Sequence, residues 1–342
     1  MSINDVAKAA GVSRGTVSNY LNHRPVSDEL AAKIKKAIKD LNYVPNSAAR
    51  DLRSQDSQFV VFIIPTVWES FFSELTYYIQ RTLIAHHFKM ILCISNSDFD
   101  QEKDYLELAD SQKAAGIISI SYSQINQHVS PSMPLVSIEK EPTGSFPLVS
   151  SNNYQGGELA GQSLHQLGCE NLVYMGGRTM PSEAMVARLS GFSDYCASKH
   201  LTFDHFGLSS YRKPVVVTEE VTRILQDLQT AGKLANAGIF ASTDEYALMI
   251  YKVLLRLHIQ VPQQVQLVGF NGSKASMQDT TTLSSIRQPV ELIAETVVKE
   301  LEKKIRQNKQ QEEATAPARI YLPVSFQQGE TTAVLSDATA ES

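Results

Sequence analysis

The stretch SINDVAKAAGVSRGTVSNYL, residues 2–21, decides the fold of the amino-terminal part of the chain. It opens with Ser2 and, three residues later, Asp5, a capping box whose hydroxyl and carboxylate bind free N–H groups at a helix start. Gly11 can adopt the left-handed conformation that ends a helix, and Ser13 is a suitable N-cap for the next one. Two helices joined by a short turn that contains glycine predict a helix-turn-helix.

A third helix is expected from Ser27. Asp28 and Glu29 lie in its first turn, where the helix dipole favours anions, and Pro45 is expected to stop it. Apolar residues recur every three or four positions and predict one shared core. That core is expected to contain Val6, Val12, Val17, Leu21, Leu30, Ile34, Ile38 and Leu41.

The motifs INDVA at 3–7, AGVS at 10–13, TVS at 16–18 and LNYVPN at 41–46 form one contiguous pattern with fixed spacings. In this pattern the segment resembles the headpiece of the LacI/GalR family of bacterial transcriptional regulators. The resemblance implies that residues 13–21 form a recognition helix that enters the major groove of DNA.

On that resemblance Arg14 and Asn19 are the expected base readers, because arginine suits guanine and asparagine suits adenine. Ser13 and Thr16 are expected to contact phosphate or sugar, which positions the helix without reading sequence. Gly15 departs from the family, which usually places a base-reading side chain there. Close approach of the backbone to DNA, heavier dependence on Arg14 and Asn19, and simple tolerance of glycine near a helix start all remain open.

Residues 46–53, NSAARDLR, resemble the hinge helix of the family. Eight residues are too few for a helix that is stable alone in water, so the resemblance implies a helix that forms when two hinges pack in the minor groove. Asn46 and Ala49 are expected to contact DNA there, and the small side chain of Ala49 permits close contact. Leu52 is expected to wedge between base pairs and bend the duplex; the alternative is an ordinary linker residue.

From residue 59 onward, apolar runs of strand length alternate with helical stretches. Strands are expected at 59–64, 90–94, 116–120, 135–138, 171–175, 237–241 and 265–269, and helices near 70–86, 101–113, 154–167, 184–199, 217–231 and 244–257. Continuous runs such as FVVFII at 59–64 are typical of parallel strands buried on both faces. The alternation restarts after residue 152 and predicts an α/β fold with two lobes of doubly wound parallel sheet and a cleft between them.

Core motifs also resemble the family, whose core is like a periplasmic sugar-binding protein. They are GGELAG at 156–161, RLSGF at 188–192, VPQQV at 261–265 and LSSIRQP at 283–289. The resemblance implies three crossings between the lobes, near Ser151, Gln288 and Pro323. The expected domains are a helix-turn-helix DNA-binding domain at 1–45, a hinge helix and linker at 46–58, an effector-binding core at 59–335 and a disordered tail at 336–342. Within the core, the N-lobe covers about 59–151 and 290–321, and the C-lobe about 152–287 and 324–335.

Carried over by position, the resemblance places eight residues in the effector cleft: Phe71, Phe72, Glu139, Arg188, Tyr211, Thr243, Asp244 and Asn271. Carboxylates and asparagine bind adjacent hydroxyls, arginine donates from a rigid fork, and an aromatic face covers a sugar ring. Phe71 and Phe72 can equally be core residues of an amphipathic helix. Asn271 departs from the family, because GFNG at 269–272 stands where an aspartate is usual. The ligand therefore stays open, with a sugar or a sugar phosphate expected.

Composition limits the class of protein. The 342 residues are 43% hydrophobic and 20% charged, which is typical of a globular protein with two or three folded units. No apolar run reaches the roughly 18 residues of a membrane span and the start lacks a secretory signal, so a cytoplasmic protein is expected. The three cysteines, Cys93, Cys169 and Cys196, are expected to be small buried hydrophobes, and neither a metal nor a cofactor is expected.

Charge is distributed unevenly along the chain. Residues 1–58 hold nine Lys or Arg against six Asp or Glu, a net charge of +3, which leaves −8 for the rest of a total of −5. A basic head on an acidic body suits nucleic-acid binding.

The resemblance implies a sequence-specific transcriptional regulator, a repressor of carbohydrate-utilisation genes that a small molecule controls from between the lobes. The expected partners are a pseudo-palindromic double-stranded operator, the effector and, since no carboxy-terminal leucine heptad is present, a second copy in a homodimer; no membrane partner is expected. An enzyme is not expected, because the sequence has no GxGxxG, phosphate loop or GxSxG elbow. A transport-linked sugar-binding protein is disfavoured by the intact headpiece and the missing signal peptide.

Overall fold

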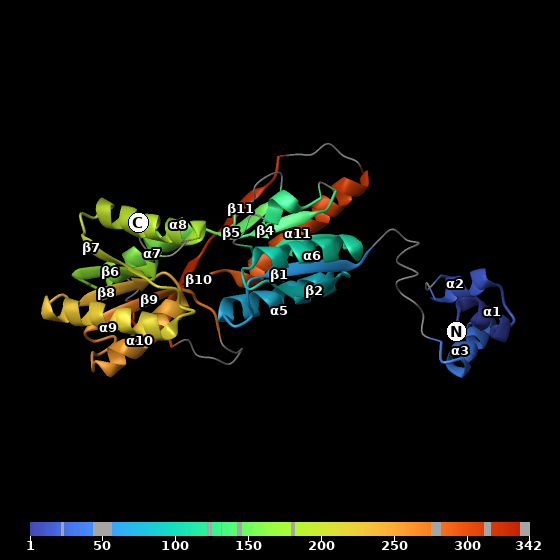
Figure 1. Cartoon of the computed structure of the whole chain (residues 1–342), viewed down its shortest axis with the longest axis horizontal. Coiled ribbons are helices and arrows are strands. Elements are labelled where there is room, and N and C mark those ends of the chain that lie inside the picture. Colours follow the sequence, from blue (N-terminus) through green and yellow to red (C-terminus); the bar gives the residue numbers. More distant parts are fainter. Residues whose placement is uncertain are drawn as a thin grey trace. The chain divides into compact units, whose positions relative to one another are not determined.

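The computed structural model of this chain describes residues 1–21, 24–43, 57–121, 123, 125–130, 132–141, 146–178, 182–274, 282–310 and 316–335. These residues form two compact units, Met1–Ser57 and Gln58–Ser342, which Figure 1 colours along the sequence. Each unit has hydrophobic clusters of its own.

The first unit, the headpiece, consists of three helices: α1 (Ile3–Ala10), α2 (Arg14–Leu21) and α3 (Asp28–Asp40). Val6, Val17 and Ile34, one from each helix, are completely buried. Full burial of such a side chain contributes roughly 1.5–3 kcal/mol, so these three residues hold the helices together. Leu30, predicted to lie in the core, is only half-buried.

The caps predicted for α1 and α2 are present. The backbone N–H of Ser2 donates to Asp5 Oδ2 at 2.7 Å, and that of Asp5 donates to Ser2 Oγ at 3.4 Å. Gly11 ends α1 with a φ of 64°. The Thr16 N–H donates to Ser13 Oγ at 3.1 Å, so Ser13 caps α2. The helix-turn-helix prediction is confirmed.

The end predicted for α3 is wrong. The helix ends at Asp40 rather than at Pro45. Asn42 takes a φ of 49°, and the Tyr43 N–H donates back to the Ile38 carbonyl at 3.0 Å. A left-handed residue followed by such a backward hydrogen bond closes a helix without proline.

The second unit contains two six-stranded sheets. The first has the order β11-β5-β4-β3-β1-β2, with all neighbouring strands parallel. Its strands are β1 (Phe59–Ile64), β2 (Lys89–Ile94), β3 (Gly116–Ser119), β4 (Leu135–Ile138), β5 (Leu148–Ser151) and β11 (Arg319–Leu322). The sheet and its helices are called the N-lobe below.

The second sheet has the order β12-β10-β9-β8-β6-β7 and is parallel except for β12, which runs antiparallel to β10. Its strands are β6 (Asn171–Gly177), β7 (Phe203–Leu208), β8 (Ala237–Ala241), β9 (Val265–Asn271), β10 (Ser284–Arg287) and β12 (Ser325–Gln327). This sheet and its helices are called the C-lobe.

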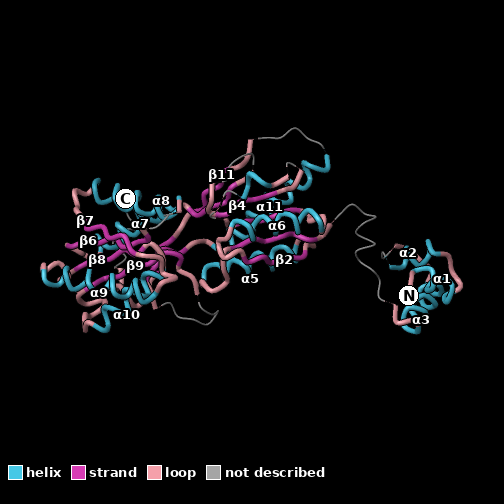
Figure 2. The backbone as a smooth tube through the Cα atoms, in the orientation of Figure 1, coloured by secondary structure: helices cyan, strands magenta, loops and turns pink. Residues whose placement is uncertain are grey.

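Helices cover both faces of each sheet (Figure 2). The N-lobe has α5 (Ser70–Ala85) and α11 (Val290–Gln310) on one face, and α6 (Phe99–Ser111) with the short 3-10 helix η1 (Ile125–His128) on the other. The C-lobe has α9 (Pro214–Thr230) and α10 (Asp244–Arg256) on one face, and α7 (Asn153–Gln166) with α8 (Glu183–Ser198) on the other. The predicted two-lobed, doubly wound α/β core is confirmed.

The chain passes between the lobes three times, after β5, after β10 and after β11. Since β5 and β10 leave their own sheets at their carboxyl ends, the carboxyl edges of the two sheets face each other. Ligands of open α/β sheets bind beyond this edge. The crossings therefore lie where a ligand of both lobes would bind.

The elements β7, β12 and α11 were not predicted from the sequence, and β5, β10 and β11 were expected only as the crossing strands that the resemblance implies near Ser151, Gln288 and Pro323. Strand β7 shows why, since its sequence FDHFGL mixes polar and apolar residues and the strand lies at a sheet edge, so it lacks the continuous apolar run of an inner strand. All three cysteines are free and buried, as predicted. Among the described residues, no helix is long and apolar enough to cross a membrane.

Candidate functional site

The exposed face of α2 carries the residues predicted to read DNA. Arg14, Gly15 and Asn19 are exposed, whereas Val17 is completely buried in the headpiece core. Arginine and asparagine are the side chains best suited to bidentate contacts with guanine and adenine. Their exposure on one short helix makes this face a candidate major-groove surface.

Ser13 and Thr16 share the start of this helix. Ser13 is exposed, Thr16 is half-buried, and their hydroxyl oxygens lie 2.9 Å apart in a mutual hydrogen bond. Because the Ser13 hydroxyl also caps the helix, a phosphate contact would have to share groups that already stabilise α2.

Gly15 has no structural requirement within the headpiece. A Cβ placed there would lie 3.5 Å from Ser13 Oγ, an ordinary contact, and would meet no other heavy atom within 4 Å. Its φ is not positive either. Since helical glycine costs about 1 kcal/mol relative to alanine, the headpiece fold itself gives no reason for glycine at this position.

The three hinge residues predicted to contact DNA, Asn46, Ala49 and Leu52, lie outside the described residues. Their roles stay predictions.

Arg188 lies at the centre of a polar network at the carboxyl edge of the C-lobe. Its side chain comes from α8 and is 5% exposed. Nε donates to Asn153 Oδ1 at 2.8 Å, and Nη1 donates to the Ser242 carbonyl at 2.7 Å. Its guanidinium carbon lies 3.6 Å from the centroid of the Phe270 ring. The arginine therefore joins α7, α8 and the ends of two strands.

Glu139 extends this network from the N-lobe. It follows β4 with a φ of 60°, and its carboxylate accepts from the Ser151 N–H at 2.6 Å and from Asn153 Nδ2 at 2.7 Å. Glu139, Ser151 and Asn153 line a cavity of about 180 Å³. Asn153 thus connects Glu139 of one lobe with Arg188 of the other.

A second chain of hydrogen bonds runs through Asn271, which replaces the aspartate that is usual in the resembled family. Asn271 is 6% exposed, and its Oδ1 accepts from Gln288 Nε2 at 2.8 Å. Gln288 Oε1 in turn accepts from Ser151 Oγ at 2.7 Å. This series of hydrogen bonds joins two of the three crossings, those near Ser151 and Gln288.

Thr243 and Asp244 form the start of α10. The Thr243 hydroxyl accepts from the Tyr246 N–H at 3.4 Å. Asp244 accepts from Ser285 Oγ at 2.6 Å and from the Gly272 N–H at 2.8 Å. Burial raises the pKa of Asp244 to about 6, against the lowering effect of these hydrogen bonds. Thr243 therefore caps α10, and Asp244 holds the start of the loop after β9 against β10.

Phe71 and Phe72 are only 5% and 3% exposed and belong to the N-lobe core. Their rings contact each other edge to face, with centroids 5.3 Å apart. The structure favours the core interpretation of both residues over the cleft interpretation, because neither ring presents an open face to a sugar.

Tyr211 reaches from the C-lobe to the N-lobe. Its hydroxyl donates to Glu69 Oε1 at 2.8 Å, and its ring contacts Tyr246 edge to face with centroids 5.5 Å apart. Burial, followed by the negative charge of Glu245, raises the pKa of Glu69 to about 7. An acidic pair thus lies beside Tyr211 where the lobes meet.

Sequence analysis missed Glu69, Asn153, Ser242 and Glu245 as site residues, and named Gln288 only as a crossing. One signal was available, because Ser242 directly follows the predicted strand 237–241 and so lies at a carboxyl end. The partnership of Asn153 with Arg188 had no such signal. Among the described residues, no group of three His, Cys, Asp or Glu could hold a metal ion.

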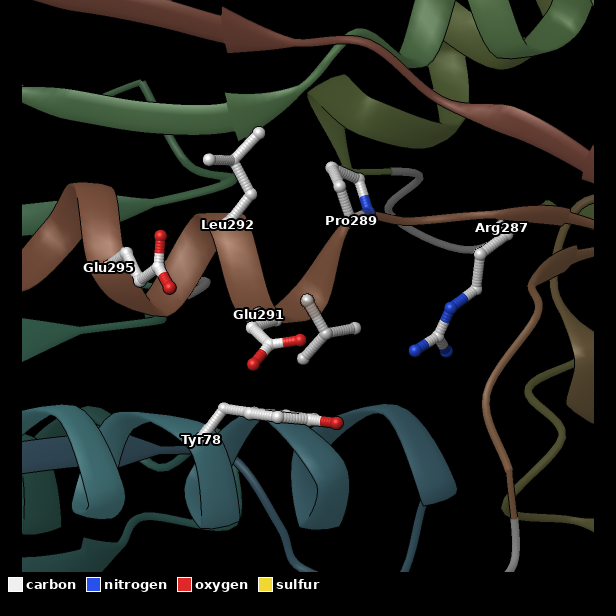
Figure 3. A pocket seen from close by; sticks show the side chains of 7 residues that line it. Tyr78, Arg287, Pro289, Glu291, Leu292 and Glu295 are labelled. Carbon is white, nitrogen blue, oxygen red and sulfur yellow. The ribbon is translucent and has the colours of Figure 1, made fainter. Parts of the chain in front are cut away.

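A larger cavity, of about 430 Å³, lies between α5 and α11. Figure 3 shows Tyr78 on α5 beneath it, Glu291 and Glu295 on α11 above, and Arg287 directed toward it from the segment before Pro289. Arg287 forms a bidentate ion pair with Glu74, at 2.5 and 2.7 Å. None of the predicted effector residues lines this cavity.

A helix-turn-helix headpiece joined to a two-lobed core with a polar network between its lobes defines the class of DNA-binding regulators with a ligand-binding core. Comparison with known proteins agrees with this class. The family "Bacterial regulatory proteins, lacI family" matches residues 2–46, and "Periplasmic binding protein-like domain" matches residues 162–332.

The chain is 32% identical over 330 residues to the sucrose operon repressor of Streptococcus mutans, covering 96% of this chain and 98% of that protein. A periplasmic binding protein/LacI transcriptional regulator from Alkaliphilus metalliredigens, solved with D-xylulofuranose, is 27% identical with a TM-score of 0.68 and covers 81% of this chain and 100% of that one. The lac repressor dimer bound to operator shares the fold, with a TM-score of 0.80 at 18% identity over 98% and 99% of the chains. This chain belongs to the LacI family of bacterial transcriptional regulators.

Proposed function

We propose that this protein is a repressor of carbohydrate-utilisation genes that binds a pseudo-palindromic operator as a homodimer and responds to a sugar bound between the lobes of its core. The class of regulator follows from family membership, and the sugar and the residues that bind it are the proposal. The proposal includes that the protein acts in the cytoplasm, where the operator is, and that it binds its sugar without changing it chemically.

The observation that carries the proposal is the polar network around Arg188. Glu139, Asn153 and Arg188 connect the two lobes through hydrogen bonds of 2.7–2.8 Å. Asn271 joins them through Gln288 and then Ser151. Carboxylates, amides and a fixed guanidinium are the groups that bind neighbouring hydroxyls of a sugar. Relatives support the same ligand class, since they include a sucrose operon repressor and a regulator solved with D-xylulofuranose.

Ligand binding would change DNA affinity by changing the arrangement of the two lobes. A sugar that exchanges hydrogen bonds with this network binds one arrangement of the lobes better than another, and only such a difference can shift the equilibrium. The headpiece and the proposed hinge precede β1 of the N-lobe in the chain. A change in the N-lobe therefore reaches them through residue 58. By thermodynamic reciprocity, DNA must change the affinity for the sugar by the same factor.

On the DNA side, we propose that Arg14 and Asn19 read bases, that Ser13 and Thr16 contact the backbone, and that Asn46, Ala49 and Leu52 lie in the minor groove. Paired recognition helices of such a dimer lie about 34–36 Å apart along the operator. Exposure of Arg14 and Asn19 on α2 supports the first assignment. The hinge assignments rest on the sequence.

The test starts with selection of binding sites from random DNA by the full-length protein. Fluorescence anisotropy then measures affinity for the selected site with and without sucrose, ribose, fructose or xylulose. We expect a palindromic site and one sugar that changes the affinity by 5-fold or more, in the usual range of allosteric coupling. Leu52→Ala should weaken DNA binding and leave sugar binding unchanged. Selection of no sequence, or an affinity that no small molecule changes, contradicts the proposal.

A further inference from the structure

We propose that Tyr211 and Arg212 of the C-lobe form a latch with Glu69 and Asn96 of the N-lobe, and that this latch sets the balance between arrangements of the lobes. These four residues are called the latch below. The inference rests on the proposed function, because it names the contact that tunes the response of operator binding to the sugar.

The latch lies at the end of both sheets that is farthest from the three crossings. In the N-lobe the crossing strands β11 and β5 form one end of the sheet, and β1 and β2 form the other. In the C-lobe β12 and β10 form one end, and β7 forms the other. Glu69 follows β1, Asn96 follows β2 and Tyr211 follows β7. When two lobes turn about a hinge, the displacement grows with distance from it, so the latch separates before contacts beside the crossings do.

The contact between Tyr211 and Glu69 joins the lobes directly. The partly buried Tyr211 hydroxyl donates to Glu69 Oε1 at 2.8 Å. Glu69 is the N-cap residue of α5, but its side chain makes no capping hydrogen bond and binds the other lobe instead. A carboxyl group accepts such a bond whether it is ionised or protonated, so the latch does not depend on the charge of Glu69.

The C-lobe side of the latch is held in place by its own lobe. Ser209, two residues before Tyr211, donates its N–H to Glu220 Oε2 at 2.7 Å, and its carbonyl accepts from the Tyr246 hydroxyl at 2.9 Å. The Tyr211 ring packs edge to face on Tyr246. Since the tyrosine is already positioned, its bond to Glu69 costs little additional side-chain entropy.

The N-lobe side of the latch includes a strained turn. Asn96 and Ser97 have φ angles of 52° and 61°, a left-handed conformation that is uncommon outside glycine. Ser95 Oγ accepts from the Ser97 N–H at 3.2 Å and donates at 3.0 Å to Glu102, which is completely buried. Such backbone persists only where its surroundings hold it. In this turn the Asn96 carbonyl accepts from Arg212 Nη1 at 3.4 Å, a second and weaker contact between the lobes.

Contacts beside the crossings differ from the latch. Gln288 and Ser151 lie at two crossings and share a hydrogen bond of 2.7 Å, and Arg287, which pairs with Glu74, directly precedes Gln288. Segments this close to the hinge move little relative to each other, so these contacts can persist while the lobes turn. The latch exists in one arrangement only, and it therefore stabilises that arrangement by an amount that does not depend on the sugar.

This independence from the sugar has a measurable consequence. A contact present in one arrangement changes the affinity of every ligand that prefers one arrangement over the other. Loss of the latch must therefore change operator affinity in the absence of sugar, as well as sugar affinity. By linkage, the two changes have opposite directions if the sugar weakens operator binding, and the same direction if it strengthens operator binding. A residue that only touches the sugar would change sugar affinity alone.

The experiment uses the full-length protein and its selected binding site. Fluorescence anisotropy measures the dissociation constant for DNA without sugar, and isothermal titration calorimetry measures those for sucrose, ribose, fructose and xylulose. Tyr211→Phe and Glu69→Ala should each change the DNA constant and that of the bound sugar by roughly three- to tenfold, the equivalent of one hydrogen bond. The double variant should show no larger change than either single variant, because both remove the same contact. Arg212→Ala should act in the same direction with a smaller change.

Two control variants match these changes outside the latch. Tyr195→Phe removes a hydroxyl whose partner, His165 Nδ1 at 3.0 Å, lies in the same lobe. Lys213→Ala removes a positive charge from the exposed residue directly after Arg212. Both controls should leave the two dissociation constants unchanged.

The outcomes separate the latch from the proposed function. If the latch variants alter sugar affinity but not operator affinity without sugar, Tyr211 is a sugar contact only and the latch is overturned. It is also overturned if neither affinity changes in variants that unfold at the wild-type temperature, or if the effects of Tyr211→Phe and Glu69→Ala simply add. If no small molecule binds the wild-type protein or alters its operator affinity, the proposed function fails. A change of operator affinity in the latch variants would then still support the latch.

Discussion

The guanidinium of Arg188 lies over the ring of Phe270, its central carbon 3.6 Å from the ring centroid. Asn153 and the Ser242 carbonyl hold the guanidinium in this place with hydrogen bonds of 2.8 and 2.7 Å. A buried cation over an aromatic ring contributes about 2 kcal/mol when desolvated. The pair therefore stabilises the C-lobe and at the same time positions the donors that we propose for the sugar.

Arg188→Ala is expected to remove the response to the sugar while operator binding persists. The core should also lose about 2–4 kcal/mol of unfolding free energy, because the variant loses the contact with Phe270 and leaves Asn153 and Ser242 without their donor. Chemical denaturation and anisotropy measure the two effects. Arg178→Ala is the control, since Arg178 pairs with Glu220 at 2.7 Å with 56% of its side chain exposed and should cost at most about 1 kcal/mol. An Arg188→Ala protein that still responds to the sugar would show that Arg188 is only structural.

The sequence predicts the fold well where the signal is local. The helix-turn-helix follows from Ser2, Asp5, Gly11 and Ser13, four residues within one short stretch, and each has its expected contact or conformation. Strand β1 was predicted at its observed bounds because all six of its residues are apolar. Five of the six are buried in the structure. Edge strand β7 lacks such a pattern and was missed, and the short crossing strands were expected only from the resemblance.

The site depends on contacts that no local pattern contains. Ser151 and Gln288 are 137 residues apart and share a hydrogen bond of 2.7 Å, and Asn153 pairs with Arg188 from another helix. The resemblance supplied positions such as Arg188, but it could not say whether Phe71 and Phe72 face the cleft. Helical spacing shows that two residues lie on a buried face; which neighbour covers that face is a tertiary property.

The stability of the core is expected to fall as pH rises from about 4 to 7. Burial raises the pKa of Glu69 from 4.5 to about 7 and that of Asp244 from 3.8 to about 6. In this window the folded state binds more protons than the unfolded state, so the free energy of unfolding decreases with pH. The loss is absent below about pH 4 and nearly complete by about pH 8, one unit above the pKa of Glu69.

Glu69→Gln tests the cause, because glutamine keeps the shape and an acceptor for Tyr211 but cannot ionise. The difference in unfolding free energy between pH 5 and pH 8, measured by denaturation, should shrink by roughly 1–3 kcal/mol. Glu107→Gln should change nothing, since Glu107 is exposed on α6. An unaltered pH dependence in Glu69→Gln would mean that Glu69 is ionised throughout in the folded protein.

Arg14→Ala is expected to relax base preference at one symmetric pair of operator positions and to cost about 1–3 kcal/mol of binding free energy there. Anisotropy with the selected site and its single-base variants measures this preference. Lys33→Ala is the control, because Lys33 pairs with Glu29 on the surface of α3 at 2.8 Å. A uniform loss across all DNA sequences would instead make Arg14 a phosphate contact.

Gly15→Ala separates the possible reasons for glycine in the recognition helix. The added methyl would meet Ser13 Oγ at 3.5 Å and no other heavy atom within 4 Å, so the isolated headpiece should gain up to about 1 kcal/mol of stability from the better helix former. If the backbone approaches DNA closely at this point, the same methyl should weaken operator binding by about tenfold or more, roughly 1.4 kcal/mol. Thermal unfolding and anisotropy on one protein measure the two effects. A variant that is both more stable and equally tight in DNA binding would show that glycine is merely tolerated there, and base reading would then rest on Arg14 and Asn19.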